Sequence, residues 1–100
     1  MPAEVRWTVR GRREVTRALN WIGRHHPDGV EPVAEAIQSQ VERLQWTPFL
    51  GTVFQRTKRG EIRETLAASY RIFYRVQHSG TVVLILSVYH ARRRVPDFSR

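Results

Sequence analysis

The sequence predicts an α+β fold in which an N-terminal strand and a helical hairpin precede a mainly antiparallel sheet of three further strands. Apolar residues alternate near the N-terminus, recur every three or four positions from residue 12 to residue 45, and form strand-like runs from residue 61 to residue 88. A period of two is typical of strands, and a period of about 3.6 is typical of amphipathic helices. The chain is long enough for one domain over residues 1–100 with a single modest core.

The first half of the chain holds the predicted first strand and both helices. Apolar and polar residues alternate over Glu4–Val9, which indicates a half-buried strand. Apolar residues at helical spacing predict one helix over Arg12–His25 and a second over Glu31–Gln45, where Pro32 suits the first turn. The short, Pro- and Gly-containing link between them favours two antiparallel helices lying across the sheet. Trp21 lies at the margin of the first apolar stripe, where it either seals the edge of the core, which we favour, or contacts a partner.

The second half holds the three further strands, predicted over Glu61–Ala67, Tyr70–Val76 and Val82–Val88. The last run is apolar except for one serine, which is typical of a central strand covered on both faces. Residues 55–60 are polar and basic and predict a loop or the tip of a hairpin. Pro96 disfavours another strand, so residues 97–100 are expected to form a loose tail.

The turn between the last two strands decides which side chains share a face of the sheet. The Ser-Gly pair at residues 79 and 80 is typical of a two-residue hairpin turn, because glycine readily adopts a positive φ. In that register Arg71 faces Val88, and Arg71, Arg75 and His90 lie on one side of the sheet. A three-residue turn would shift the register by one and place Tyr89 beside Arg71 instead. We predict the two-residue turn.

The charge of the chain is unevenly distributed. The net charge of +8 comes from 16 arginines and one lysine against nine acidic residues. Residues 1–50 carry seven basic and six acidic groups, net +1, whereas residues 51–100 carry ten basic and three acidic groups, net +7. Such an excess favours a polyanionic partner, either nucleic acid or an acidic protein. The alternative is that the arginines are ordinary solvated cations.

Several kinds of site are excluded or disfavoured. The chain has no cysteine, which excludes disulfides, thiolate nucleophiles and cysteine-based metal sites. The adjacent His25 and His26 would point about 100° apart on a helix, so we expect no metal and no cofactor. No apolar run approaches the length of a membrane span, and the N-terminus lacks a signal-peptide pattern. We therefore expect no membrane partner and a cytoplasmic location.

The residues near the C-terminus suit one metal-free reaction, the cleavage of RNA by its own 2′-hydroxyl. This reaction needs a proton acceptor, a proton donor and cations around the phosphate. His90 could be the acid or the base, with Glu61 or Glu64 as nearby carboxylates. Arg71 and Arg93 could hold the phosphate. Further candidates for contacting a nucleic acid or another target are Arg56, Lys58, Arg59, Arg63, Arg75, Tyr89, Arg92 and Arg94. Alternatively, the arginines are solvated strand residues and His90 simply ends a strand.

Four segments give the chain a recognisable pattern. They are VRWTV in the first strand, VERLQWTPFLGT at the end of the helical hairpin, and IRETLAASYRIFYRV and VVLILSVYHARR in the sheet. Together they resemble the RelE/ParE superfamily of bacterial toxins from type II toxin–antitoxin systems, over nearly the whole chain. The resemblance implies a growth-inhibiting toxin that is neutralised by a cognate antitoxin. We expect this antitoxin to be acidic, to bury apolar anchors at Trp21, Trp46 and Phe49, and to pair with the C-terminal arginines.

The superfamily contains two activities. RelE-like members are ribosome-dependent mRNA endoribonucleases, and the resemblance places their catalytic arginine at Arg71 and the catalytic histidine of some members at His90. Their basic pair on the preceding strand is incomplete here, because its first position is Glu61 and only Arg63 matches the second. ParE-like members poison DNA gyrase, and the Ile-Arg-Glu, YRI-x-Y and His-x-x-Arg patterns that they often show occur at residues 62–64, 70–74 and 90–93. We therefore favour the ParE-like activity. The ribonuclease is the alternative, and an inactive binding module is a third hypothesis.

Overall fold

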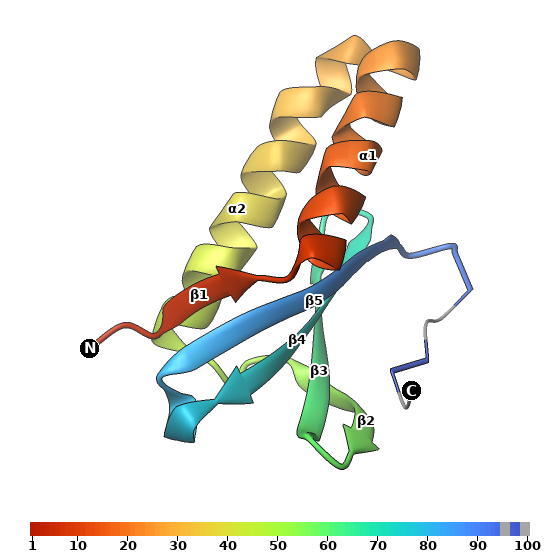
Figure 1. The fold of residues 1–100 in the computed structure, drawn as a ribbon. Helices are drawn as coiled ribbons and strands as arrows, with labels where there is room; N and C mark the ends of the chain where they lie inside the picture. The colour runs from red at the N-terminus through yellow and green to blue at the C-terminus, as the bar shows by residue number, and fades with distance from the viewer. Residues whose placement is uncertain (95–96, 99–100) are drawn as a thin grey trace.

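The computed structural model describes residues 1–94, 97 and 98. Its helices and strands, in chain order, are β1 (Glu4–Trp7), α1 (Val9–His25), α2 (Val30–Trp46), β2 (Thr52–Thr57), β3 (Gly60–Ala67), β4 (Tyr70–Gln77) and β5 (Val82–His90) (Figure 1). Two short 3₁₀ helices, Pro27–Gly29 and His78–Gly80, make the turns between α1 and α2 and between β4 and β5.

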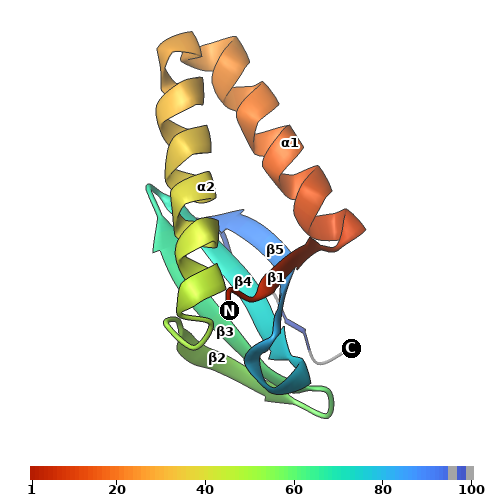
Figure 2. The ribbon, with the colours of Figure 1, turned by 90° about the vertical axis from the view of Figure 1, so that its left-hand side faces the viewer.

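The five strands form one mixed sheet in the order β1-β5-β4-β3-β2. β1 runs parallel to β5, and the other neighbouring pairs are antiparallel. α1 and α2 form a hairpin that packs against one face of the sheet, which we call the helix face (Figures 1 and 2). We call the opposite side the open face.

Apolar side chains form a cluster on each face of the sheet. The main core lies between the helix face and the helical hairpin. Its buried members are Ala3, Ile22, Ile37, Val41, Leu44, Ala67, Tyr70, Ile72, Tyr74, Val83, Ile85 and Val88. On the open face, the fully buried Phe73 has its ring centroid 4.8 Å from that of Phe54 and 5.4 Å from that of Phe98. Because successive strand residues point to opposite faces, β4 contributes to both clusters.

The predicted α+β class is confirmed, but four strands follow the helical hairpin instead of three. Residues 52–57 form β2, although we predicted a loop or hairpin tip from residue 55 onwards. β2 pairs with β3 through a bulge between Val53 and Gln55. A bulge interrupts the alternation of apolar residues, which hid the strand in the sequence. Lys58 and Arg59 do form the predicted hairpin tip.

Both predicted helices are present. α2 extends one residue beyond each predicted end, whereas α1 begins at Val9, three residues before Arg12. Thr8 explains the early start, because its hydroxyl accepts a hydrogen bond from the Gly11 N–H at 3.0 Å and caps the helix. β1 therefore ends at Trp7, and Val9, which we predicted to lie in the strand, is a 69% exposed helix residue.

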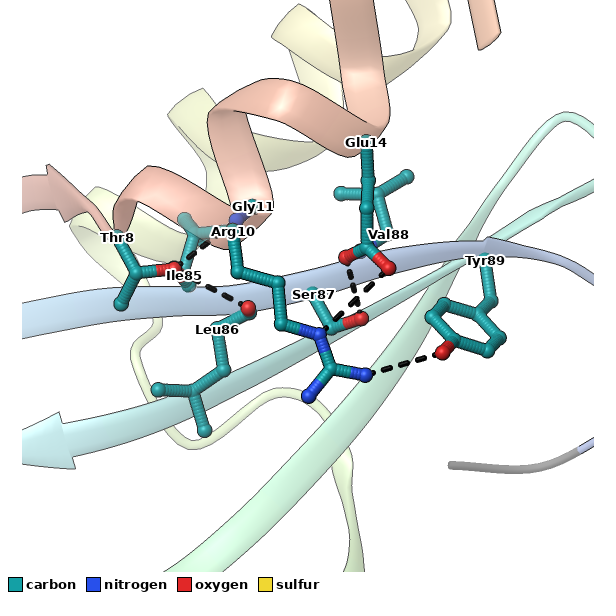
Figure 3. Close-up of polar contacts among 9 residues, drawn as sticks. All are labelled: Thr8, Arg10, Gly11, Glu14, Ile85, Leu86, Ser87, Val88 and Tyr89. Atoms are coloured by element: carbon teal, nitrogen blue, oxygen red, sulfur yellow. Dashed lines mark hydrogen bonds and ion pairs between the residues drawn. The ribbon is translucent and has the colours of Figure 1, made fainter. Parts of the chain in front are cut away.

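Thr8 and Glu14 attach α1 to the edge of β5 beyond the end of β1 (Figure 3). The Thr8 hydroxyl lies 3.0 and 3.1 Å from the carbonyl oxygens of residues 85 and 86. Glu14 Oε1 accepts hydrogen bonds from Ser87 Oγ at 2.6 Å and from the Val88 N–H at 3.1 Å. α1 thus satisfies backbone groups of β5 that β1 is too short to reach.

The β4–β5 hairpin contains both registers that the sequence allows. Near the turn, Arg75 pairs with Leu84, as we predicted for the two-residue turn. Leu86 is then an extra residue in β5, which shifts the outer pairs by one, so Arg71 faces Tyr89 instead of the predicted valine. The predicted register is therefore right beside the turn and wrong beyond the bulge.

Part of the predicted loose tail is packed on the open face. The Phe98 N–H donates to Gln55 Oε1, and Gln55 Nε2 donates to Asp97 Oδ1, both at 3.1 Å. The Phe98 ring also contacts Phe73, because the open face of β4 offers an aromatic surface. The prediction is therefore wrong for Asp97 and Phe98, and residues 99–100 lie outside the described part of the chain.

Gly51 connects the loop after α2 to the middle of the sheet. Its N–H donates to the buried hydroxyl of Tyr74 at 2.8 Å, and burial raises the pKa of this hydroxyl despite that hydrogen bond. A Cβ atom at Gly51 would lie 2.5 Å from the Glu64 carbonyl oxygen and 2.7 Å from the Tyr74 hydroxyl. A side chain at this position must displace either the backbone of β3 or the tyrosine.

We predict that Gly51→Ala lowers the free energy of unfolding by about 2–3 kcal/mol, because it overpacks this contact and strains its hydrogen bond. Gly23→Ala is the matched control. Its added methyl group would meet only Val30 Cγ2, at 3.6 Å, and it should raise the stability of α1 by up to about 1 kcal/mol. Urea unfolding curves measure both values. Equal changes in the free energy of unfolding for the two variants would contradict the close approach of β3 and Tyr74 to Gly51.

We also predict that Glu14→Ala costs about 1–3 kcal/mol of unfolding free energy, because it leaves the Ser87 hydroxyl and the Val88 N–H without their acceptor. Glu35→Ala removes an exposed carboxylate from α2 and should change stability by less than about 0.5 kcal/mol. Thermal unfolding of the two variants compares these effects. A loss for Glu14→Ala no larger than that for Glu35→Ala would show that α1 does not hold the edge of β5.

Candidate functional site

The Arg71 side chain forms hydrogen bonds and aromatic contacts within the protein. It lies on the open face, where its Nε and Nη2 donate to Glu64 Oε2 at 2.9 and 2.6 Å. Its guanidinium carbon also lies 5.2 Å from the ring centroid of Phe73 and 5.7 Å from that of Phe54. Only 19% of the side chain is exposed. Its positive charge is therefore balanced by a carboxylate and covered by aromatic rings.

His90 lies on the other side of the sheet from Arg71. It pairs with Tyr70 and packs edge-on against that ring, with centroids 5.2 Å apart. Its Nδ1 accepts a hydrogen bond from the Arg92 N–H at 3.2 Å. The prediction that Arg71, Arg75 and His90 share one face is therefore wrong for His90, because the bulge in β5 shifts the outer pairs by one residue.

Arg63 and Glu61 form a separate group that holds the loop between α2 and β2. Arg63 Nη1 donates to the carbonyl oxygens of Gly51 at 2.7 Å and Phe49 at 3.3 Å, and Nη2 donates to Glu61 Oε1 at 3.2 Å. Glu61 also forms an ion pair with Arg56 at 3.4 Å. These contacts show that Arg63 stabilises the loop between α2 and β2. Neither Glu61 nor Glu64 lies beside His90.

The other cations of the second half that the structure describes lie at two ends of the sheet. Lys58 and Arg59 are exposed at the tip of the β2–β3 hairpin. Arg75 lies nearby and is buried, and burial lowers the pKa of its guanidinium, with a further lowering from the charge of Arg59. The others follow the far end of β5, where Arg92, Arg93 and Arg94 are exposed.

A basic cleft lies between α1 and the C-terminal end of β5. It is lined by Glu14, Arg17, Ala18, Trp21, Arg24, Tyr70, Val88, Tyr89, His90, Arg92 and Arg93. None of its four arginines forms an ion pair within the described residues. Its one carboxylate, on Glu14, accepts from β5 and lies 3.6 Å from Arg10 Nε. The cleft therefore combines uncompensated positive charge with the rings of Trp21 and Tyr70, which suits an anionic ligand that also has apolar groups.

The sequence reasoning missed the arginines of α1. The net charge of the first half of the chain is only +1, because the acidic residues of that half offset these arginines. α1 alone has five arginines and one glutamate, net +4, whereas α2 has three glutamates and one arginine, net −2. Counting charge helix by helix would have identified Arg17 and Arg24. Their position opposite the end of β5 follows only from the fold.

The three predicted antitoxin contacts are exposed but lie in two places. Trp21 is 49% exposed beside the basic cleft and stacks on His25 with ring centroids 4.2 Å apart, so it does not seal the core as we favoured. Trp46 and Phe49 are 72% and 57% exposed at the opposite end of the helical hairpin, where α2 ends. Leu50 is also exposed there. These residues form a second, apolar surface.

The described residues contain neither a metal-binding cluster nor a membrane-spanning helix. Within residues 1–94 and 97–98, no three His, Asp or Glu side chains gather closely enough to hold a metal ion. The helices in the same part of the chain are too short or too polar to cross a bilayer.

Comparison with known proteins identifies the family. Residues 5–95 match the family model described as the ParE toxin of the type II toxin–antitoxin system parDE. Among solved structures, the chain is similar to the RelBE2 toxin–antitoxin complex of Mycobacterium tuberculosis, with 24% identity, coverage of 90% of this chain and 99% of that chain, and a TM-score of 0.64. It is also similar to the chromosomal ParDE system of P. aeruginosa (16% identity, 90% and 97% coverage, TM-score 0.69) and to the RelE–RelB complex of Pyrococcus horikoshii OT3 (18% identity, 94% and 100% coverage, TM-score 0.61). No significant match was found among curated protein sequences. Because the family model covers almost the entire chain, this protein belongs to the ParE toxin family of type II toxin–antitoxin systems.

Proposed function

We propose that this toxin inhibits growth by acting on DNA gyrase, and that an acidic antitoxin neutralises it by occupying the basic cleft. One observation favours gyrase over messenger RNA as the target of this toxin. The residues that a ribonuclease of this superfamily would use do not converge, because Arg71 and His90 lie on opposite faces of the sheet.

The chemistry of RNA cleavage requires these groups to act on one phosphate. A general acid or base must come within about 3 Å of the proton that it transfers, and the cation must contact the same phosphate. The sheet itself separates His90 from Arg71. To bind a phosphate, Arg71 would also have to give up two hydrogen bonds to Glu64. These contacts favour the ParE-like activity over the RelE-like alternative.

The charge of the cleft and the nature of the similar structures both support binding of an antitoxin at the cleft. One similar structure is described as a toxin–antitoxin complex and another as a RelE–RelB complex. In this chain, Arg17, Arg24, Arg92 and Arg93 line the cleft without carboxylate partners among the described residues. An acidic segment with an aromatic or aliphatic anchor for Trp21 would complement both its charge and its apolar surface.

Expression of the toxin alone in a bacterium tests the target. We expect growth arrest and double-stranded DNA breaks covalently linked to gyrase, while ribosome-bound mRNA stays intact. His90→Gln should arrest growth as strongly as the unchanged chain, because its imidazole takes no part in chemistry. Ribosome-positioned mRNA cuts that disappear in His90→Gln or Arg71→Ala would instead establish the ribonuclease. Absence of growth arrest from the folded protein would support the inactive binding module.

Binding of the antitoxin encoded beside the toxin gene tests the cleft. Replacing Arg92 and Arg93 together with glutamine should weaken the complex about two- to thirtyfold, because each exposed ion pair contributes about 0.2–1 kcal/mol. Raising the salt concentration should weaken the unchanged complex and reduce this difference. Arg43→Gln, on the exposed side of α2, is the control and should leave the affinity within about twofold. Equal affinities for all three proteins, at every salt concentration, would exclude the cleft as the acidic segment's site.

A further inference from the structure

Arg75 is a buried cation that has no carboxylate partner in the part of the chain that the structure describes. The residue is 8% exposed, and none of the acidic groups in the described residues lies within ion-pair distance of its guanidinium. Nη2 donates to Thr57 Oγ1 at 3.2 Å, while the buried Nε has no hydrogen-bond partner within residues 1–94 and 97–98. Buried charges and buried N–H groups in proteins are almost always paired, because an unpaired one carries the full cost of desolvation.

Arg71 lies on the same face of the same strand and has a carboxylate partner, whereas Arg75 has none among the described residues. Arg71 directs Nε and Nη2 at the carboxylate of Glu64, a β3 residue. Four residues before Glu64, at the start of β3, the chain has Gly60 instead of a glutamate. Among the described residues, a Cβ atom at Gly60 would have only Arg75 Cδ within 4 Å, apart from its own chain neighbours. Gly60 therefore supplies no carboxylate beside Arg75, at the position equivalent to that of Glu64 beside Arg71.

The residues around Arg75 add positive charge and fix its position. Thr57 Oγ1 donates to the Gly60 carbonyl oxygen at 2.8 Å and accepts from the Arg59 N–H at 3.2 Å, so it ties Arg75 to the hairpin tip. Arg59 is close enough for its charge to disfavour the protonated form of Arg75. Lys58 is exposed beside it. A bound anion would relieve this repulsion and supply the missing acceptor.

We propose that Arg75, Arg59 and Lys58 form a binding site for the phosphate backbone of a nucleic acid. Lys58 and Arg59 lie at the tip of the β2–β3 hairpin, and Arg75 lies on β4 close to Gly60. Three neighbouring cations match a polymer with regularly spaced negative charges better than they match a single carboxylate. The tip of the β2–β3 hairpin lies at the end of the sheet farthest from the helical hairpin, so a long polymer can reach it without meeting α1 or α2 (Figures 1 and 2). The site is separate from the basic cleft, and a bound antitoxin in that cleft would leave it accessible.

Fluorescence anisotropy with a labelled 12-base DNA oligonucleotide tests the proposal, with only this chain and the oligonucleotide present. Across about 50–200 mM salt, Arg75→Met should make the slope of log affinity against log salt shallower by about one, the value expected for the loss of one phosphate contact. Arg59→Gln, an exposed substitution that spares the fold, should also reduce the slope. Arg43→Gln changes the net charge equally but lies on α2, and should leave the slope unchanged.

Thermal unfolding in inorganic phosphate separates a binding role from a structural one. Phosphate should raise the melting temperature of the unchanged chain more than that of Arg75→Met. Without phosphate, Arg75→Met should melt within about 4 °C of the unchanged chain, because it removes an unpaired buried charge. Unchanged salt slopes for both Arg75→Met and Arg59→Gln would overturn the proposal. So would a large loss of stability in Arg75→Met, or an Arg75-dependent affinity for polyglutamate but not for DNA. None of these outcomes depends on whether gyrase is the toxin's target.

Discussion

The attachment of α1 to the edge of β5 is the contact on which the arrangement of this protein depends. β1 is only four residues long and stops pairing where β5 still has half of its length to run. Thr8 and Glu14 then take over as partners of the β5 backbone, within the same few residues where Leu86 bulges out of the ladder (Figure 3). The bulge sets which side chains of β4 and β5 share a face, and the attached helix forms one wall of the basic cleft.

Two groups of arginines in the chain have different physical roles. Arg63 and Arg71 are largely covered, hydrogen-bonded to carboxylates or carbonyl oxygens, and packed on phenylalanine rings, so they stabilise the fold. The arginines of the cleft are uncompensated within the described residues and are available to a partner. Net charge does not distinguish these groups, because each arginine counts once wherever it lies. Position in the fold therefore decides which cations act on another molecule.

The architecture could be predicted from the sequence, but the arrangement of the residues in the candidate site could not. Helical spacing and alternation located both helices and the three clearest strands, because those patterns report directly on which side of an element is buried. β2 was missed in part because its bulge breaks the alternation. Which faces carry Arg71 and His90 could not be predicted, since one extra residue in β5 reverses the outcome and leucine has no strong signature of a bulge. The cleft joins α1 to residues about 70 positions away, and no local pattern reports such a contact.

The position of β1 also affects the order in which the molecule can assemble. Among the described strands it pairs with β5 alone, and Glu4 pairs with Val82, almost the full length of the domain away. During translation the first strand is made early but has no edge to join until the last strand has left the ribosome. The wall of the cleft on α1 and the wall on β5 meet at that same moment. A chain interrupted before β5 would leave α1 without the strand that it anchors, so incomplete translation products would lack the cleft.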